Sequence, residues 1–155
     1  MGGKAPHHAH SCPQILLQSH FRIAKGDEWL ITRTPCVLLQ RTTAKEQSRR
    51  LIAAELPASF LSEHGAVVIE NHLNMIRPIA GSPAVSAAML AELLNSVILD
   101  RAFRCIGGSV AVSAYELENL PLPSPADLKH LAGRNPSRMA IEKACSQLYV
   151  ADGKA

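Results

Sequence analysis

The stretch from Ser82 to Pro123 constrains the fold most, because it joins amphipathic segments to a glycine pair and a proline-rich end. Ser82 before Pro83 predicts a helix start, since serine caps free N–H groups and proline suits the first helical position. The apolar residues that follow at helical spacing are Val85, Met89, Leu90, Leu93, Leu94 and Val97. We therefore predict a helix over Pro83–Ser96 with one apolar face that needs a partner.

A second amphipathic segment, Ile98–Ile106, predicts another helix that turns Phe103 inward and its arginines outward. Gly107–Gly108 is expected to end this helix through a left-handed backbone, which glycine adopts at little cost. Val110 and Val112 alternate with small residues and predict a short strand. We expect the apolar residues of this stretch to be core, above all Leu93, Leu94, Phe103 and Leu117.

The composition is that of one globular domain. Of the 155 residues, 47% are hydrophobic but only 4% are aromatic, so the core must be built mainly from Leu, Ile, Val and Ala. The net charge of +3 permits nucleic acid as a partner without demanding it. The sequence has no apolar run of the length that spans a membrane, and no long apolar segment near its start that would indicate a secretory signal.

The cysteines and histidines do not suggest a metal site. Cys12, Cys36, Cys105 and Cys145 are widely scattered, and no pair has the short spacing of zinc ligands. We expect reduced, mostly buried thiols in a cytoplasmic protein. Three histidines near the start, within residues 1–14, lie in what we expect to be a disordered tail, where metal binding would be adventitious.

Several short segments predict strands. Cys36–Gln40 is a continuous apolar run, Leu51–Leu56 follows a basic segment, and Gly65–Glu70 is rich in valine and isoleucine. Trp29–Ile31 is a weaker strand candidate. The predicted fold is mixed α/β (α+β): a short, twisted, mostly antiparallel sheet with packed helices, the Pro83–Ser96 helix lying across it.

The segment Arg41–Arg50, RTTAKEQSRR, is the most basic part of the chain. Cations interleaved with hydroxyls and amides suit contacts to phosphate oxygens. The candidate DNA contacts are Arg41, Thr42, Thr43, Lys45, Arg49 and Arg50. The same composition also fits a solvated polar turn between two strands.

The string ENHLN, residues 70–74, is the most distinctive short motif. On a strand, His72 and Asn74 would share one face and Asn71 the other. Asparagine can pair with adenine in the major groove, which makes Asn71, His72 and Asn74 further candidate DNA contacts. These side chains can equally hold a turn or satisfy buried carbonyls.

Taken in order, these pieces resemble the C-terminal target-recognition region of N6-adenine DNA methyltransferases from restriction–modification systems. The basic segment, ENHLN, a helix ending in LLNS, an aromatic–arginine pair, a glycine turn and AYELENL before prolines carry the resemblance, from about Val37 to Pro123. It departs at the glycine turn, where relatives often have a polar run and this chain has SVAVS. The resemblance implies duplex DNA as partner and a recognition rather than a catalytic role.

The catalytic signatures of such enzymes are missing from this sequence. A methyltransferase needs a glycine loop after a strand for S-adenosylmethionine and an (N/D)PP(Y/F) segment for the flipped adenine. Asn135–Pro136 lacks the second proline and the aromatic ring, and Gly107–Gly108 follows a predicted helix. We therefore expect no catalytic residue and no cofactor in this chain, with S-adenosylmethionine on a separate catalytic domain.

The sequence thus predicts a DNA-binding specificity fragment that positions duplex DNA for adenine-N6 methylation. We expect a recognition-like domain over 15–123, C-terminal helices over 124–150 and a polar tail over 151–155. One alternative is a protein-interaction module that docks on a methyltransferase or nuclease subunit. Another is a non-functional truncated remnant.

Overall fold

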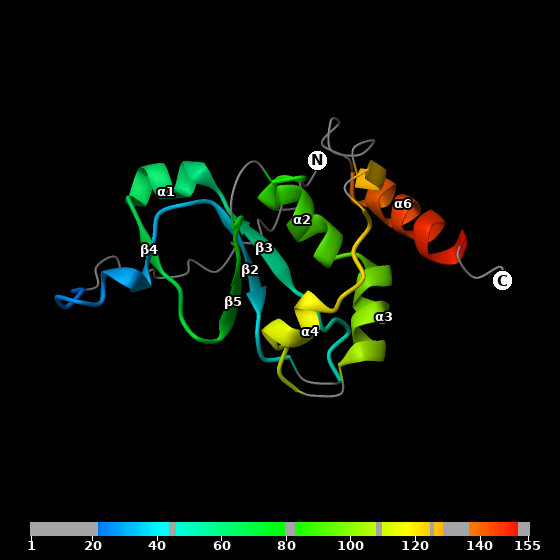
Figure 1. Cartoon of the computed structure of the whole chain (residues 1–155), viewed down its shortest axis with the longest axis horizontal. Coiled ribbons are helices and arrows are strands. Elements are labelled where there is room, and N and C mark those ends of the chain that lie inside the picture. The colour runs from blue at the N-terminus through cyan, green and yellow to red at the C-terminus, as the bar shows by residue number, and fades with distance from the viewer. Residues whose placement is uncertain are drawn as a thin grey trace, which may run out of the picture.

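The computed structural model describes residues 22–43, 46–79, 83–107, 110–124, 126–128 and 137–151 (Figure 1). The predicted tail at residues 1–14, the candidate phosphate contact Lys45 and the predicted capping residue Ser82 lie outside these ranges. Within them, helices and short antiparallel strands confirm the predicted α+β class.

The central sheet has the order β3-β2-β5, with β2 (Cys36–Gln40) between β3 (Ala53–Leu56) and β5 (Leu73–Ile76). Both pairings are antiparallel, and Leu39 lies opposite Ala53 on one side and Asn74 on the other. The CVLLQ run is the middle strand because buried side chains line it on both faces. A separate two-stranded ribbon pairs β1 (Ile31–Thr32) with β4 (Val67–Val68).

Helix α2 (Ala87–Leu94) packs on β2 and β3, as Figure 1 shows, so the predicted helix across the sheet is present. Its predicted start is wrong. Ser86, not Ser82, is the capping residue, and its Oγ accepts a hydrogen bond of 3.2 Å from the Met89 N–H. Both serines suit a cap by type, and the chain from Pro83 to Val85 instead lines a groove beside the sheet.

The other helices surround this core. Helix α3 (Val97–Ile106) begins at the buried cap Ser96, and α4 (Ala114–Glu118) begins with a reciprocal capping box between Ser113 and Glu116. Helix α6 (Arg138–Ala151) packs against α2 and α3. A short helix α1 (Ala58–His64) follows β3, and residues 126–128 are helical.

Three local predictions are corrected. The predicted Trp29–Ile31 strand holds only at Ile31, which begins β1: Glu28–Leu30 forms a 3-10 turn (η1), and Trp29 is 78% exposed. The predicted Gly65–Glu70 strand shrinks to Val67–Val68, because only those residues find a partner strand. The predicted strand at Val110–Val112 is only a single bridge, between Ala111 and Thr42.

Gly107 ends α3, but not by the predicted left-handed turn. Its φ is −100°, which any residue adopts. The need for glycine is steric: a Cβ at this position would lie 2.7 Å from Glu116 Oε1 and 3.3 Å from the Phe103 ring. Glycine therefore allows α4 and α3 to approach each other closely.

The main core lies between the sheet and helices α2, α3 and α6. Leu93, Leu94 and Phe103 are buried as predicted, and Leu117 packs against them while partly exposed. Cys36 and Cys145 are buried free thiols, and burial raises the pKa of both. Met139 of α6 is 80% exposed. Within the described ranges, no helix has the length and apolarity needed to span a membrane.

Candidate nucleic-acid interface

Three segments that are distant in sequence meet where β2 ends, at the lower edge of Figure 1. The Arg41 N–H donates to the His72 carbonyl at 2.8 Å, and the Val112 N–H donates to the Arg41 carbonyl at 2.6 Å. The Thr43 N–H donates to the Val110 carbonyl at 3.2 Å. The basic segment, the ENHLN turn and the chain after α3 therefore form one surface, which we call the β2-end surface.

The exposed side chains of the β2-end surface include those of Arg41, Thr42, Asn71 and His72, together with the acidic Glu70 and the apolar Val110. The Arg41 guanidinium reaches the Asn71 carbonyl at 3.4 Å. Asn71 and His72 lie in a turn before β5 rather than on a strand, so their predicted alternation between faces is wrong. The turn brings both side chains to the same end of the sheet as Arg41.

Asn74 has a half-buried position on β5, and its amide donates to the Val112 carbonyl at 2.7 Å. His72 lies 3.5 Å from the exposed carboxylate of Glu70. The carboxylate of Glu70 therefore lies next to the His72 ring in this turn. Asn74 connects the start of β5 to the chain after α3.

The last two residues of the basic segment, Arg49 and Arg50, face the protein instead. Arg50 is only 3% exposed: its Nε donates to the buried Thr43 hydroxyl at 2.8 Å, and its guanidinium lies 5.8 Å from the centre of the Phe103 ring. The Arg49 guanidinium donates to the Asn95 carbonyl. Thr43, Arg49 and Arg50 thus contribute to the packing of the segment in this structure.

Asp100 holds this arrangement together. Its Oδ1 accepts the N–H groups of Arg50 at 2.5 Å and Leu51 at 2.9 Å, and its Oδ2 accepts Arg104 Nε at 2.8 Å. Arg104 in turn donates from Nη2 to the main-chain carbonyl of Gln47 at 2.9 Å. We call these contacts the α3 clamp. This clamp was not among the predictions, although an Asp–Arg pair four residues apart on a helix indicates such an ion pair.

Asn95 was also missed as a structural link. Its side chain bonds both ways with Ala53 of β3: Oδ1 accepts the N–H at 3.0 Å and Nδ2 donates to the carbonyl at 2.8 Å. An asparagine at a helix end commonly replaces backbone pairing in this way. Asn95 therefore joins the end of α2 to the strand that follows the basic segment.

Burial would raise the pKa of Asp100, but the hydrogen bond from Arg104, the two backbone N–H groups and the Arg104 charge outweigh it. The pKa of Asp100 is consequently lowered from its ordinary 3.8. A lowered carboxyl pKa means that the ionised form stabilises the fold. This contribution is complete above 3.8 and is lost as pH falls through the lower pKa of the folded state.

We therefore expect the stability of the chain to fall more steeply in acid than that of an Asp100→Asn variant. The difference in free energy of unfolding between the two should be largest at neutral pH and should shrink below pH 3.8. Urea unfolding followed by circular dichroism at a series of pH values measures it. Glu92→Gln, at an exposed position on α2, is the matched control. A difference that stays constant with pH would contradict the assignment.

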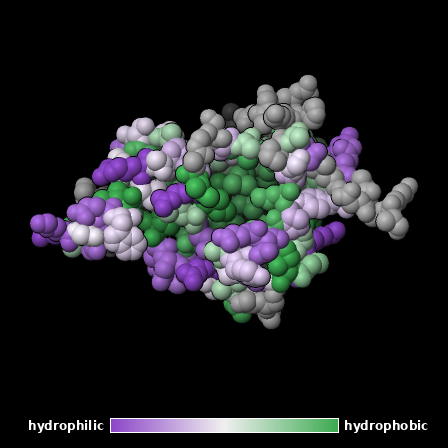
Figure 2. Space-filling model, in the orientation of Figure 1, coloured by the Kyte–Doolittle hydropathy of each residue, from purple (hydrophilic) through white to green (hydrophobic). Residues whose placement is uncertain are grey.

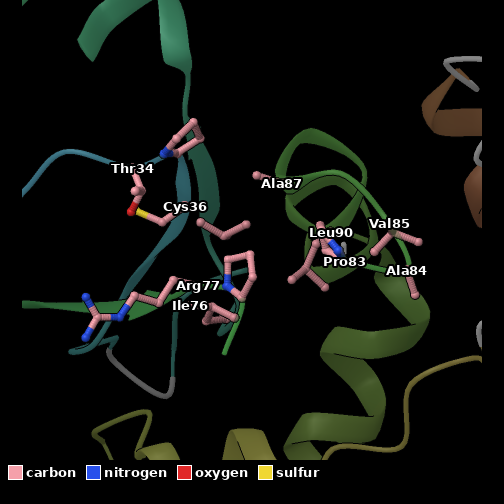
Figure 3. A pocket seen from close by; sticks show the side chains of 12 residues that line it. Thr34, Cys36, Ile76, Arg77, Pro83, Ala84, Val85, Ala87 and Leu90 are labelled. Atoms are coloured by element: carbon pink, nitrogen blue, oxygen red, sulfur yellow. The ribbon is translucent and has the colours of Figure 1, made fainter. Parts of the chain in front are cut away.

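A groove of about 500 Å³ lies between the sheet and the chain leading into α2. Figure 2 shows hydrophobic residues gathered at the middle of this face, and Figure 3 shows Pro83 and Leu90 facing Ile76 across the groove. The Arg77 side chain extends away from it (Figure 3). The groove therefore offers apolar contact and little polar specificity.

Gly107 lies at the end of helix α3 rather than after a strand, and Glu116 and Phe103 lie beside it. No group of three or more histidine, cysteine or acidic side chains in the described part of the chain is arranged to hold a metal ion.

Comparison with known proteins gives two significant similarities among curated sequences. The chain is 31% identical over 104 residues, 66% of its length, to the Type II methyltransferase M.BsuBI of Bacillus subtilis. It is 30% identical over 99 residues, 63% of its length, to the Type II methyltransferase M.PstI of Providencia stuartii. The matches cover 21% and 19% of those proteins, so the chain spans about a fifth of their length.

No family model and no solved structure matches the chain. The similarity to these two methyltransferases covers about two thirds of the chain. This chain therefore contains a region related to Type II methyltransferases.

Proposed function

We propose that the chain is a DNA-binding specificity part of a site-specific adenine-N6 DNA methyltransferase. In this role it positions duplex DNA for methylation by a catalytic domain that the sequence does not contain. The similarity to Type II methyltransferases, over only about a fifth of their length, supports a part of such an enzyme rather than the whole. S-adenosylmethionine would bind to the catalytic domain.

The convergence of Arg41, Asn71 and His72 on the β2-end surface carries the proposal. An arginine guanidinium suits a phosphate oxygen, and an exposed Asn71 amide or His72 ring suits a base edge. The hydrogen bond to Asn71 and the backbone pairing fix the three residues relative to one another. Such fixed geometry lowers the entropy cost of binding.

The buried side chains limit what the interface contains. Thr43 and Arg50 bind each other inside the protein, and the half-buried Arg49 donates to the Asn95 carbonyl. The proposed phosphate contacts of the described residues therefore reduce to Arg41 and Thr42. Few cations give a weak electrostatic attraction. We therefore propose that tight binding needs the catalytic domain on the other side of the duplex.

Replacing Arg41 by alanine should weaken binding of the full chain to a random-sequence duplex and flatten its salt dependence. The slope of log affinity against log salt, measured between about 50 and 200 mM, should fall by about one unit because one phosphate contact is lost. Fluorescence anisotropy with a labelled duplex measures both quantities.

Arg33→Ala is the matched control for this experiment, because Arg33 is an exposed cation that precedes β2 whereas Arg41 follows it. The control should bind like the wild type. Equal loss in both variants would point to net charge rather than to the β2-end surface. If the wild type does not bind at the lower salt, autonomous DNA binding is wrong.

The apolar groove favours a second candidate function, a module that docks on a methyltransferase catalytic subunit. Its lining residues, such as Val37, Ile76 and Leu90, give an apolar surface next to α2. A complex held there should be insensitive to salt, whereas a phosphate-bound complex weakens as salt rises. Size-exclusion chromatography of the chain with a catalytic subunit at two salt concentrations separates the two functions.

A further inference from the structure

The α3 clamp binds the main chain at and next to the tip of the basic segment, residues 46–48. Arg104 fixes the Gln47 carbonyl at 2.9 Å, and Asp100 fixes the N–H groups of Arg50 and Leu51 at 2.5 and 2.9 Å. Because Asp100 and Arg104 also bind each other at 2.8 Å, both anchors belong to one face of α3. The main chain between Gln47 and Leu51 is therefore anchored at both ends.

The side chains within this anchored stretch divide into two sets. Those of Arg49 and Arg50 turn toward the protein, to the Asn95 carbonyl, the Thr43 hydroxyl and the Phe103 ring. The residues that remain exposed are Glu46, Gln47 and Ser48. The fold thus directs the cations inward and presents a short polar tip to the solvent.

The chemistry of the three exposed side chains differs. A Glu46 carboxylate is repelled by phosphates, and the Ser48 hydroxyl is short and bonds to any base. The Gln47 amide has a donor and an acceptor on a long side chain, which matches N6 and N7 of adenine in the major groove. Within the described residues, the side-chain amide of Gln47 makes no hydrogen bond, whereas the main-chain carbonyl of Gln47 accepts one from Arg104.

We infer that Gln47 is a base-reading residue that contacts one adenine of the recognised DNA sequence. The inference rests on the proposed DNA-binding function and adds the residue that determines specificity at one base pair. The α3 clamp serves as the rigid support that a specific base contact requires, since a mobile tip would lose its geometry. In this proposal, Arg41 and the ENHLN turn contact the same duplex.

Selection from a pool of duplexes with a randomised central segment tests the inference on the full-length chain. The wild type should enrich a sequence that contains an adenine. Gln47→Ala should lose the preference at that one base pair by about 5- to 150-fold and keep the preferences elsewhere. Gln47→Glu should shift the same position toward cytosine, because a carboxylate accepts from cytosine N4.

Gln147→Glu on α6 is the matched control, since Gln147 is also an exposed glutamine and lies away from the clamp. It should enrich the wild-type sequence. If both Gln47 variants also enrich the wild-type sequence, or weaken every position equally, Gln47 does not read a base while the proposed function stands. If the wild type enriches nothing, either alone or together with a methyltransferase catalytic subunit, the proposed function fails and this inference fails with it.

Discussion

Replacing Asp100 by alanine should lower the free energy of unfolding by about 3–5 kcal/mol. The carboxylate is 5% exposed and accepts two backbone N–H groups as well as the Arg104 guanidinium. Alanine leaves those donors without an acceptor in a buried place, which costs far more than a surface ion pair contributes. Urea unfolding followed by circular dichroism measures the loss.

The control for this prediction is Glu92→Ala, at an exposed position on α2, which should stay within about 0.5 kcal/mol of the wild type. Asp100→Asn should fall between the two, because the amide keeps one acceptor oxygen and the shape of the side chain. A loss below about 1 kcal/mol for Asp100→Ala would show that water or a rearranged loop replaces the carboxylate.

Replacing Phe103 by alanine should lower the free energy of unfolding by about 3–5 kcal/mol, because it empties a fully buried aromatic site. The ring also lies under the Arg50 guanidinium and against Gly107, so its removal loosens the basic segment and the α3–α4 contact together. Thermal or urea unfolding measures the loss, and the variant should also lose the slow amide hydrogen exchange of the Arg50 and Leu51 N–H groups.

Tyr115→Ala supplies the matched aromatic control, because Tyr115 lies on α4 and is 74% exposed. It should change stability by no more than about 0.5 kcal/mol. Phe103→Leu, which keeps most of the apolar volume, should lose less than Phe103→Ala. If alanine and leucine cost the same, the aromatic ring rather than the filled volume is what matters at this position.

The elements with strong local patterns were predictable. CVLLQ is a strand and VILDRAFRCI is a helix, because continuous apolar residues and helical spacing are properties of the segments themselves. Weak segments were not: ENHLN is a turn followed by a strand, and GAVVIE forms only a two-residue strand. Short strands exist only where a partner strand lies beside them, and sequence neighbours do not reveal that partner.

In the candidate site, too, some features were predictable from the sequence and others depended on distant residues. The sequence indicated that Arg41–Arg50 and ENHLN matter together, and hydrogen bonds between Arg41 and both Asn71 and His72 bring them together. It did not indicate that Arg50 and Thr43 turn inward. Composition treats every arginine of RTTAKEQSRR alike, whereas contacts with distant residues separate them. The Asp100 carboxylate, fifty residues away along the chain, binds the main-chain N–H of Arg50, and the Arg50 guanidinium lies over the Phe103 ring.

By itself, then, the sequence determined the class of fold, the apolar faces of α2 and α3, and the basic and ENHLN segments, since these follow from residue type and spacing. Only the tertiary structure decided which cations face solvent, which side chains lie close to Gly107 and that the anchored tip at Gln47 is exposed. Those properties depend on contacts between α3, α4 and the basic segment. Contacts between distant segments arise when the core closes, and no local pattern encodes them.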